Sequence, residues 1–132
     1  ALKELRAAHR ISGDVSMWPV MADCERGLGK PLKALALAGS PEVSRLAKAE
    51  EIEMRIVASG ARRDLGEFDA AVITLTCKEL KVKNEPWSVR LHYAYADALS
   101  CAGRSDEARQ WFAACAELDE DESTDAFERS QQ

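Results

Sequence analysis

The sequence has no apolar run that approaches the roughly 20 residues needed to cross a bilayer, and its start, ALKELRAAHR, lacks the charged-then-apolar pattern of a signal peptide. Aromatic residues make up only 6% of the 132 residues, β-branched residues are also few, and Ala is abundant, a balance that favours helices over strands. Basic residues number 18 against 23 acidic ones, which gives a net charge of −5. We therefore expect a cytoplasmic chain whose main partner is neither nucleic acid nor membrane, because both attract clusters of Lys and Arg.

Groups with catalytic or metal-binding spacing are also missing. His9 and His92 lie far apart, and the pattern supports no Ser-His-Asp or Cys-His grouping. No two cysteines have the C-x-x-C spacing of a zinc or redox site, so we expect free, buried thiols in a reducing compartment. The cysteines are Cys24, Cys77, Cys101 and Cys115. We predict no enzymatic activity, no cofactor and no metal.

What the sequence does contain is a repeat. Three of its seven glycines, Gly29, Gly66 and Gly103, are spaced by 37 residues. A small residue stands seven positions before each glycine and an Ala five positions after it, and Phe112 follows the last glycine by nine. The small residues are Ala22, Ser59 and Ala96 before the glycines, and Ala34, Ala71 and Ala108 after them.

This spacing predicts antiparallel helix hairpins. We expect first helices at about 16–28, 48–65 and 87–102 and second helices at about 31–38, 68–80 and 105–118, the last one capped by Ser105. Glycine ends the first helix of each pair, because a residue without Cβ adopts the left-handed cap conformation without penalty. The small residues let the two helices approach closely, and larger apolar residues such as Phe112 fill the space beside them. Since one hairpin cannot bury its apolar face alone, the copies are expected to stack into an all-α solenoid.

This pattern consists of a small residue, a Gly seven positions later and an Ala five positions after the Gly. It resembles the tetratricopeptide (TPR) repeat, and the chain resembles a bacterial TPR-like protein. Residues 92–119 match best, and WPVMA near Trp18 is similar to the family's W-x-x-L-G opening. The period of 37 departs from the family's usual value of about 34, and Glu25 and Arg62 replace an apolar residue. The resemblance implies a right-handed α–α superhelix of antiparallel helix hairpins.

We expect a helical-repeat domain at 1–119 and an acidic C-terminal cap or tail at 120–132. The domain divides into a partial repeat at 1–13 and repeats at about 14–46, 47–84 and 85–119. Ala1, Leu5 and Ala8 have the spacing of a second helix, which we expect at 1–11, and the chain starts without Met. We therefore expect that a longer protein preceded it.

The resemblance also implies that the first helices of the pairs line a concave groove. Arg suits such a surface because it pairs bidentately with carboxylates, and Tyr because it offers a flat contact at low entropic cost. The alternative is a solvated helix face without a ligand. The expected groove residues are Asp23, Arg26, Ile56, Arg63, Arg90, Tyr93 and Asp97.

Arg26, Arg62 and Arg63 suggest either a basic spot for an acidic peptide or structural ion pairs, and we favour the ion pairs. The carboxylates within reach are Glu25, Asp64 and Glu67. His92 is expected at a helix–helix seam. Trp111 is expected either to cover the last repeat together with Phe127 or to be exposed as a contact for another molecule.

The acidic tail carries one further hypothesis, a calcium loop of the EF-hand type. Glu122 stands where such a loop needs Gly, which favours a solvated cap of the solenoid instead. The oxygen ligands would be Glu117, Asp119, Asp121, Asp125 and Glu128.

Taken together, these patterns predict a non-enzymatic protein–protein interaction module whose partner is a protein or peptide. A structural role is the alternative, with self-association into a homo-oligomer through an exposed terminal hairpin.

Overall fold

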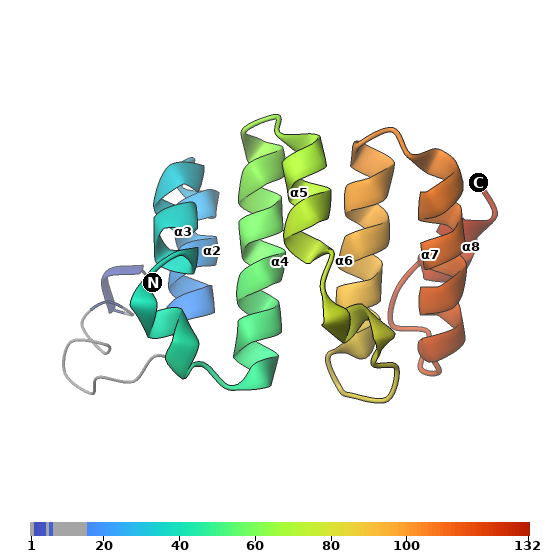
Figure 1. The fold of residues 1–132 in the computed structure, drawn as a ribbon, viewed down its shortest axis with the longest axis horizontal. Coiled ribbons are helices and arrows are strands. Elements are labelled where there is room, and N and C mark those ends of the chain that lie inside the picture. The colour runs from blue at the N-terminus through green and yellow to red at the C-terminus, as the bar shows by residue number, and fades with distance from the viewer. Residues whose placement is uncertain (1, 5, 7–15) are drawn as a thin grey trace. The chain divides into compact units, whose positions relative to one another are not determined.

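The computed structural model describes residues 2–4, 6 and 16–132, and Figure 1 shows that this part of the chain is built from helices. No strand occurs among these residues, and residues 2–4 and 6 are also helical, so the expected all-α class is confirmed. No helix in the described part is both long and apolar enough to cross a membrane. The elements are α2 (Trp18–Gly27), α3 (Pro31–Ala38), the 3₁₀ helix η1 (Pro41–Arg45), α4 (Lys48–Asp64), α5 (Phe68–Leu75), the 3₁₀ helix η2 (Lys78–Lys81), α6 (Ser88–Cys101), α7 (Ser105–Leu118) and α8 (Ala126–Ser130).

The chain forms two compact units, residues 1–67 and 68–132. The division lies between α4 and α5, inside the repeat expected at 47–84. The helix hairpins that the structure places within one unit are therefore α2–α3 in the first and α6–α7 in the second.

In the first unit, α2, α3 and α4 pack on one another. The indole N–H of Trp18 donates hydrogen bonds to the Leu37 carbonyl at 2.9 Å and to Ser40 Oγ at 3.0 Å, which ties α2 to the end of α3. Pro19 and Pro31 stand at helix starts, where a missing N–H costs nothing. The buried core consists of Trp18, Met21, Ala22, Ala34, Met54, Val57 and Ala61.

In the second unit, α6 and α7 form the central hairpin, α5 contacts α6, and α8 contacts α7. The indole of Trp111 packs from α7 onto two rings of α6, at a centroid distance of 5.5 Å from His92 and 4.8 Å from Tyr95. The buried residues of this hairpin include Leu91, Tyr95, Ala96, Leu99, Ala108, Phe112 and Cys115.

The same turn follows α2, α4 and α6. Gly29, Gly66 and Gly103 have φ values of 76°, 75° and 79°, in the left-handed region that suits glycine. Each glycine N–H donates to the carbonyl three residues back, and the next N–H donates to the carbonyl five back, which is the Schellman pattern. The small residues around these turns are buried, namely Ala22, Ala34, Ser59, Ala71, Ala96 and Ala108.

Helix starts differ from the sequence analysis in detail. Ser105 is the first residue of α7 and does not cap it, since Arg104 holds the N-cap position without a side-chain bond. The segment after Leu75 is not a continued helix but a break followed by η2. Most of the expected helix at 1–11 lies outside the described residues, including Ala1, Leu5, Ala8 and His9.

The acidic tail and the cysteines also differ from what the sequence predicts. The tail contains a short helix, α8. The four cysteines are free thiols, but only Cys115 is buried. Cys101 is exposed because the last turn of α6 turns it toward solvent, and the other two are partly accessible.

Candidate functional site

The residues expected to line a groove are divided between the two units. Asp23 and Arg90 are exposed, and the other five are partly accessible. The structure brings Asp23 and Arg26 together with α4 in the first unit, and Tyr93 and Asp97 together with α8 in the second. They lie on α2 (Asp23, Arg26), α4 (Ile56, Arg63) and α6 (Arg90, Tyr93, Asp97).

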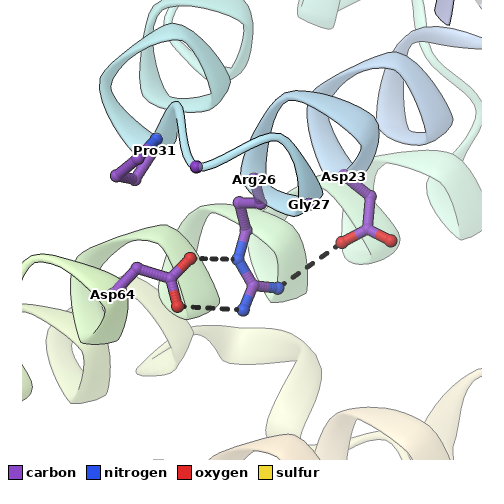
Figure 2. Close-up of a pocket in the computed structure, with 6 residues that line it drawn as sticks. Asp23, Arg26, Gly27, Pro31 and Asp64 are labelled. Atoms are coloured by element: carbon purple, nitrogen blue, oxygen red, sulfur yellow. Dashed lines mark hydrogen bonds and ion pairs between the residues drawn. The ribbon is translucent and has the colours of Figure 1, made fainter.

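Arg26 is the centre of the site in the first unit (Figure 2). Its Nε donates to Asp64 Oδ2 at 2.7 Å and its Nη2 to Asp64 Oδ1 at 3.2 Å, so the pair is bidentate. Nη1 lies 3.4 Å from Asp23 Oδ1. The hydrogen bonds from Arg26 lower the pKa of Asp64 below its ordinary value. Because Asp64 ends α4, the guanidinium also offsets an unfavourable carboxylate at the negative end of a helix.

Gly60 supplies the surface on which this guanidinium lies. A Cβ at Gly60 would be 2.5 Å from both Cζ and Nη1 of Arg26 and 3.0 Å from Nη2. Any side chain at this position would therefore displace the guanidinium. The sequence analysis named Asp64 among the carboxylates within reach of the arginines but missed Gly60, although a glycine inside a helix is itself a signal of close approach.

A depression of about 490 Å³ opens beside Arg26. It lies where α2 ends and the turn to α3 begins, next to the last residue of α4 (Figure 2). Two carboxylates and one guanidinium line it near two helix C-termini, which carry partial negative charge. These groups suit the binding of a polar or cationic group. The lining residues are Asp23, Arg26, Gly27, Gly29, Pro31 and Asp64.

A second polar cluster joins α6 to α8 in the second unit. Arg129 Nη1 donates to Asp97 Oδ1 at 2.9 Å and to the Tyr93 hydroxyl at 3.2 Å. The Tyr93 hydroxyl in turn donates to Asp125 Oδ1 at 2.6 Å. Burial raises the pKa of Tyr93, and its hydrogen bond to Asp125 adds to the shift. The guanidinium also lies 4.2 Å from the ring centroid of Phe112.

The candidate calcium loop is closed by its own hydrogen bonds. Asp119 accepts bonds from the backbone N–H and the hydroxyl of both Ser123 and Thr124, at 2.6–2.9 Å. The bond from the Thr124 hydroxyl is the main reason that the pKa of Asp119 falls to about 2. Among the described residues, no three His, Cys, Asp or Glu side chains gather where they could hold a metal ion. The candidates Glu117, Asp119, Asp121, Asp125 and Glu128 are thus not brought together.

Of the three arginines for which ion pairs are favoured over a basic spot, Arg26 and Arg62 form such pairs. Arg26 pairs with Asp64, and Arg62 pairs with Glu67 at 2.7 Å. The buried carboxylate of Glu25 accepts a bond from Arg6. The charges of Arg26 and Arg62 are therefore compensated within the chain.

His92 and Cys115 are structural rather than reactive. His92 is buried, its Nδ1 lies 2.8 Å from the Ser88 carbonyl, and burial lowers its pKa. Burial raises the pKa of the Cys115 thiol to about 11, which suppresses the thiolate that a nucleophile requires. Trp111 is only partly accessible, and Phe127 is 64% exposed.

Comparison of the chain with known protein families, with curated proteins and with solved structures finds no match. Functional inference therefore rests on the two clusters described above, one in each unit. In both clusters, the polar side chains are already paired with other side chains of the same unit.

Proposed function

We propose that this chain is a non-enzymatic interaction module of the TPR type, which binds a protein or peptide along its first helices and stacks its hairpins into a right-handed α–α superhelix. The repeated turn supports the repeat assignment, because three glycines spaced by 37 residues adopt the same φ and the same pair of hydrogen bonds. The buried small residues beside these turns agree with close hairpin packing.

The single observation that carries a binding role is the arrangement of Arg26. Its guanidinium is held bidentately by Asp64, lies against the backbone at Gly60, and borders a depression in the surface. A side chain that is already ordered loses little entropy when a partner binds. Arg is also frequent among residues that dominate binding energy at interfaces.

A non-catalytic role agrees with the ionisable groups that are perturbed. Cys115 is held as a thiol, and Asp119 is an ionised hydrogen-bond acceptor that organises a loop. Neither residue lines the depression next to Arg26.

The test is affinity capture with the full chain from the cells that make it, followed by titration of the captured partner with purified components. We expect Arg26→Ala to weaken binding at least tenfold, which corresponds to about 1.4 kcal/mol. Arg62→Ala is the matched control, since it removes another paired Arg from the same unit, and its affinity should stay within twofold. Equal affinity of the Arg26→Ala variant and the unaltered chain would refute the assignment.

Self-association is a second candidate because apolar side chains are exposed at the tip of the α2–α3 hairpin. Leu28 is 59% exposed and Leu32 is 69% exposed. Light scattering over a hundredfold range of concentration separates the two candidates. A mass that remains at one chain throughout excludes self-association, whereas a rising mass that Leu32→Ser abolishes supports it.

A further inference from the structure

The short helix α8 packs against α7, and one of its arginines makes polar contacts with α6. Arg129 reaches from α8 to Asp97 at 2.9 Å and to the Tyr93 hydroxyl at 3.2 Å. Its Cζ lies 4.2 Å from the Phe112 ring centroid and 5.8 Å from that of Tyr93. One guanidinium is thus bound by a carboxylate, a phenol oxygen and two aromatic rings.

This combination is specific for a guanidinium rather than for positive charge in general. A planar, delocalised cation stacks on aromatic rings and donates several hydrogen bonds in fixed directions, whereas an ammonium is a compact, strongly hydrated charge. Tyr93 donates its own proton to Asp125, so its oxygen is available as an acceptor for Arg129. Asp97 and Arg129 are each only about one-quarter exposed, at 26% and 24%, so solvent screens the pair less than an open surface pair.

Apart from these contacts, α8 is a short helix that packs against α7. The helix has five residues, far fewer than the roughly 12–15 that an isolated helix needs to be even marginally stable in water. Ala126 is its one buried residue, and Phe127 is 64% exposed. Release of α8 would uncover Tyr93, Asp97 and the ring of Phe112, on which the Arg129 guanidinium lies.

We propose that Tyr93, Asp97 and Phe112 form a recognition site for an arginine in a partner peptide, and that Arg129 occupies this site within the chain until the partner replaces it. The inference rests on the proposed function as a peptide-binding module and names the chemistry of its ligand. A tethered segment acts at an effective concentration in the millimolar range. The site in the unaltered chain is therefore largely closed to weak competitors and opens to a peptide with contacts beyond its arginine.

The probe is a fluorescent peptide of residues 119–132, added to the full chain and followed by fluorescence anisotropy. The variant Ala126→Asp/Arg129→Glu undocks α8, because it buries a charge and reverses the ion pair. We expect this variant to bind the peptide saturably and at least tenfold more tightly than the unaltered chain. Asp97→Asn added to the variant should lower the affinity at least tenfold.

Two altered peptides test the chemistry. A peptide with Arg129→Gln should bind the open variant at least tenfold more weakly. A peptide with Arg129→Lys should also bind more weakly, because the ammonium does not reproduce the stacked, forked contact. If the Arg129→Lys peptide binds as tightly as the unaltered peptide, the site recognises only positive charge, and the proposed arginine site is overturned.

Circular dichroism checks that the variants remain folded. If Ala126→Asp/Arg129→Glu loses its helical signal, Arg129→Gln alone replaces it, since that change keeps Ala126 in place. A folded variant that binds no peptide, or an unaltered chain that binds the peptide equally well, overturns the inference. The Arg26→Ala test concerns the other unit and uses the captured partner. Failure of the peptide-binding test would therefore overturn the arginine site without deciding the proposed function.

Discussion

Gly60→Ala should gain almost no stability, although replacing a glycine inside a helix by alanine ordinarily stabilises by about 1 kcal/mol. Gly60 lies within α4, and the Arg26 guanidinium covers it. A Cβ only 2.5 Å from Cζ and Nη1 cannot coexist with the observed position of that group. The guanidinium is the end of a flexible side chain and can move away, but the movement breaks its paired bonds with Asp64.

The size of the loss follows from the exposure of the pair. The Arg26 and Asp64 side chains are 28% and 36% exposed, so solvent screening limits their interaction to about 0.5–1 kcal/mol. This loss offsets most of the gain in helix propensity. In an Arg26→Ala background the obstruction is absent, and Gly60→Ala should then stabilise by its full value of about 1 kcal/mol.

Urea unfolding at pH 7 compares the unaltered chain, Gly60→Ala, Arg26→Ala and the double variant. We expect a coupling energy between the two substitutions of about 0.5–1 kcal/mol. An NMR titration of the Asp64 carboxyl gives an independent result. Arg26 holds the pKa of Asp64 below its ordinary value, and Gly60→Ala should raise it. An Arg62→Ala background is the control, in which Gly60→Ala should behave as in the unaltered chain. Equal stabilisation with and without Arg26, at an unchanged Asp64 pKa, would refute the reasoning.

Ala34→Leu should destabilise the fold by about 1–3 kcal/mol through overpacking, because Ala34 is fully buried. The control Ala36→Leu, on the exposed side of α3, should change the stability by less than about 0.5 kcal/mol. The urea midpoints of the two variants measure this difference. Gly29→Ala should cost about 1–2 kcal/mol because of its left-handed φ of 76°, while Gly27→Ala, two residues earlier at the end of α2 and with open space around it, should be neutral or stabilising in the same assay. Asp119→Asn should lower the thermal midpoint at pH 7. Because the folded pKa of Asp119 lies at about 2, below its ordinary value of about 3.9, the stability it contributes is present above pH 4 and is lost as pH falls toward 2. The difference between the two chains should therefore shrink over that range, and a constant difference would contradict the role given to its hydrogen bonds.

The spacing of glycines and small residues predicted the helices and their turns because these features depend on local chemistry. A positive φ after Leu28, Leu65 and Ala102 requires glycine there, and the close approach of α2 and α3 requires small side chains such as Ala34. The helix boundaries expected at 31–38 and 105–118 accordingly coincide with α3 and α7.

The sequence offered Asp64 as one of three carboxylates for the arginines, but it could not assign a particular partner to each polar residue. Asp64 lies 38 residues from Arg26, and Arg129 lies 32 from Asp97, and no local pattern links residues at such separations. The helix α8 was missed because five residues in an acidic segment show no apolar periodicity. Its position depends on contacts of Arg129 rather than on helix propensity.

The burial of a charged residue in the first unit has a physical explanation. The resemblance to the TPR pattern predicts an apolar residue at the position of Glu25, and the Glu25 side chain is fully buried. A buried carboxylate is costly unless a cation compensates it. Arg6 supplies that cation through a bond to Oε1 of Glu25. The pattern identified the position as internal, but only the structure identifies the residue that makes a charge acceptable there.

The polar clusters around Arg26 and Arg129 share one property, which is that the chain already pairs their charged side chains. Asp64 holds Arg26 in the first unit, and Arg129 holds Asp97 in the second. A partner that uses either residue must therefore exchange one ion pair for another, so the net gain is smaller than the contact itself suggests. Such an exchange favours discrimination over affinity, because a ligand without the correct charge and geometry leaves the internal pair in place.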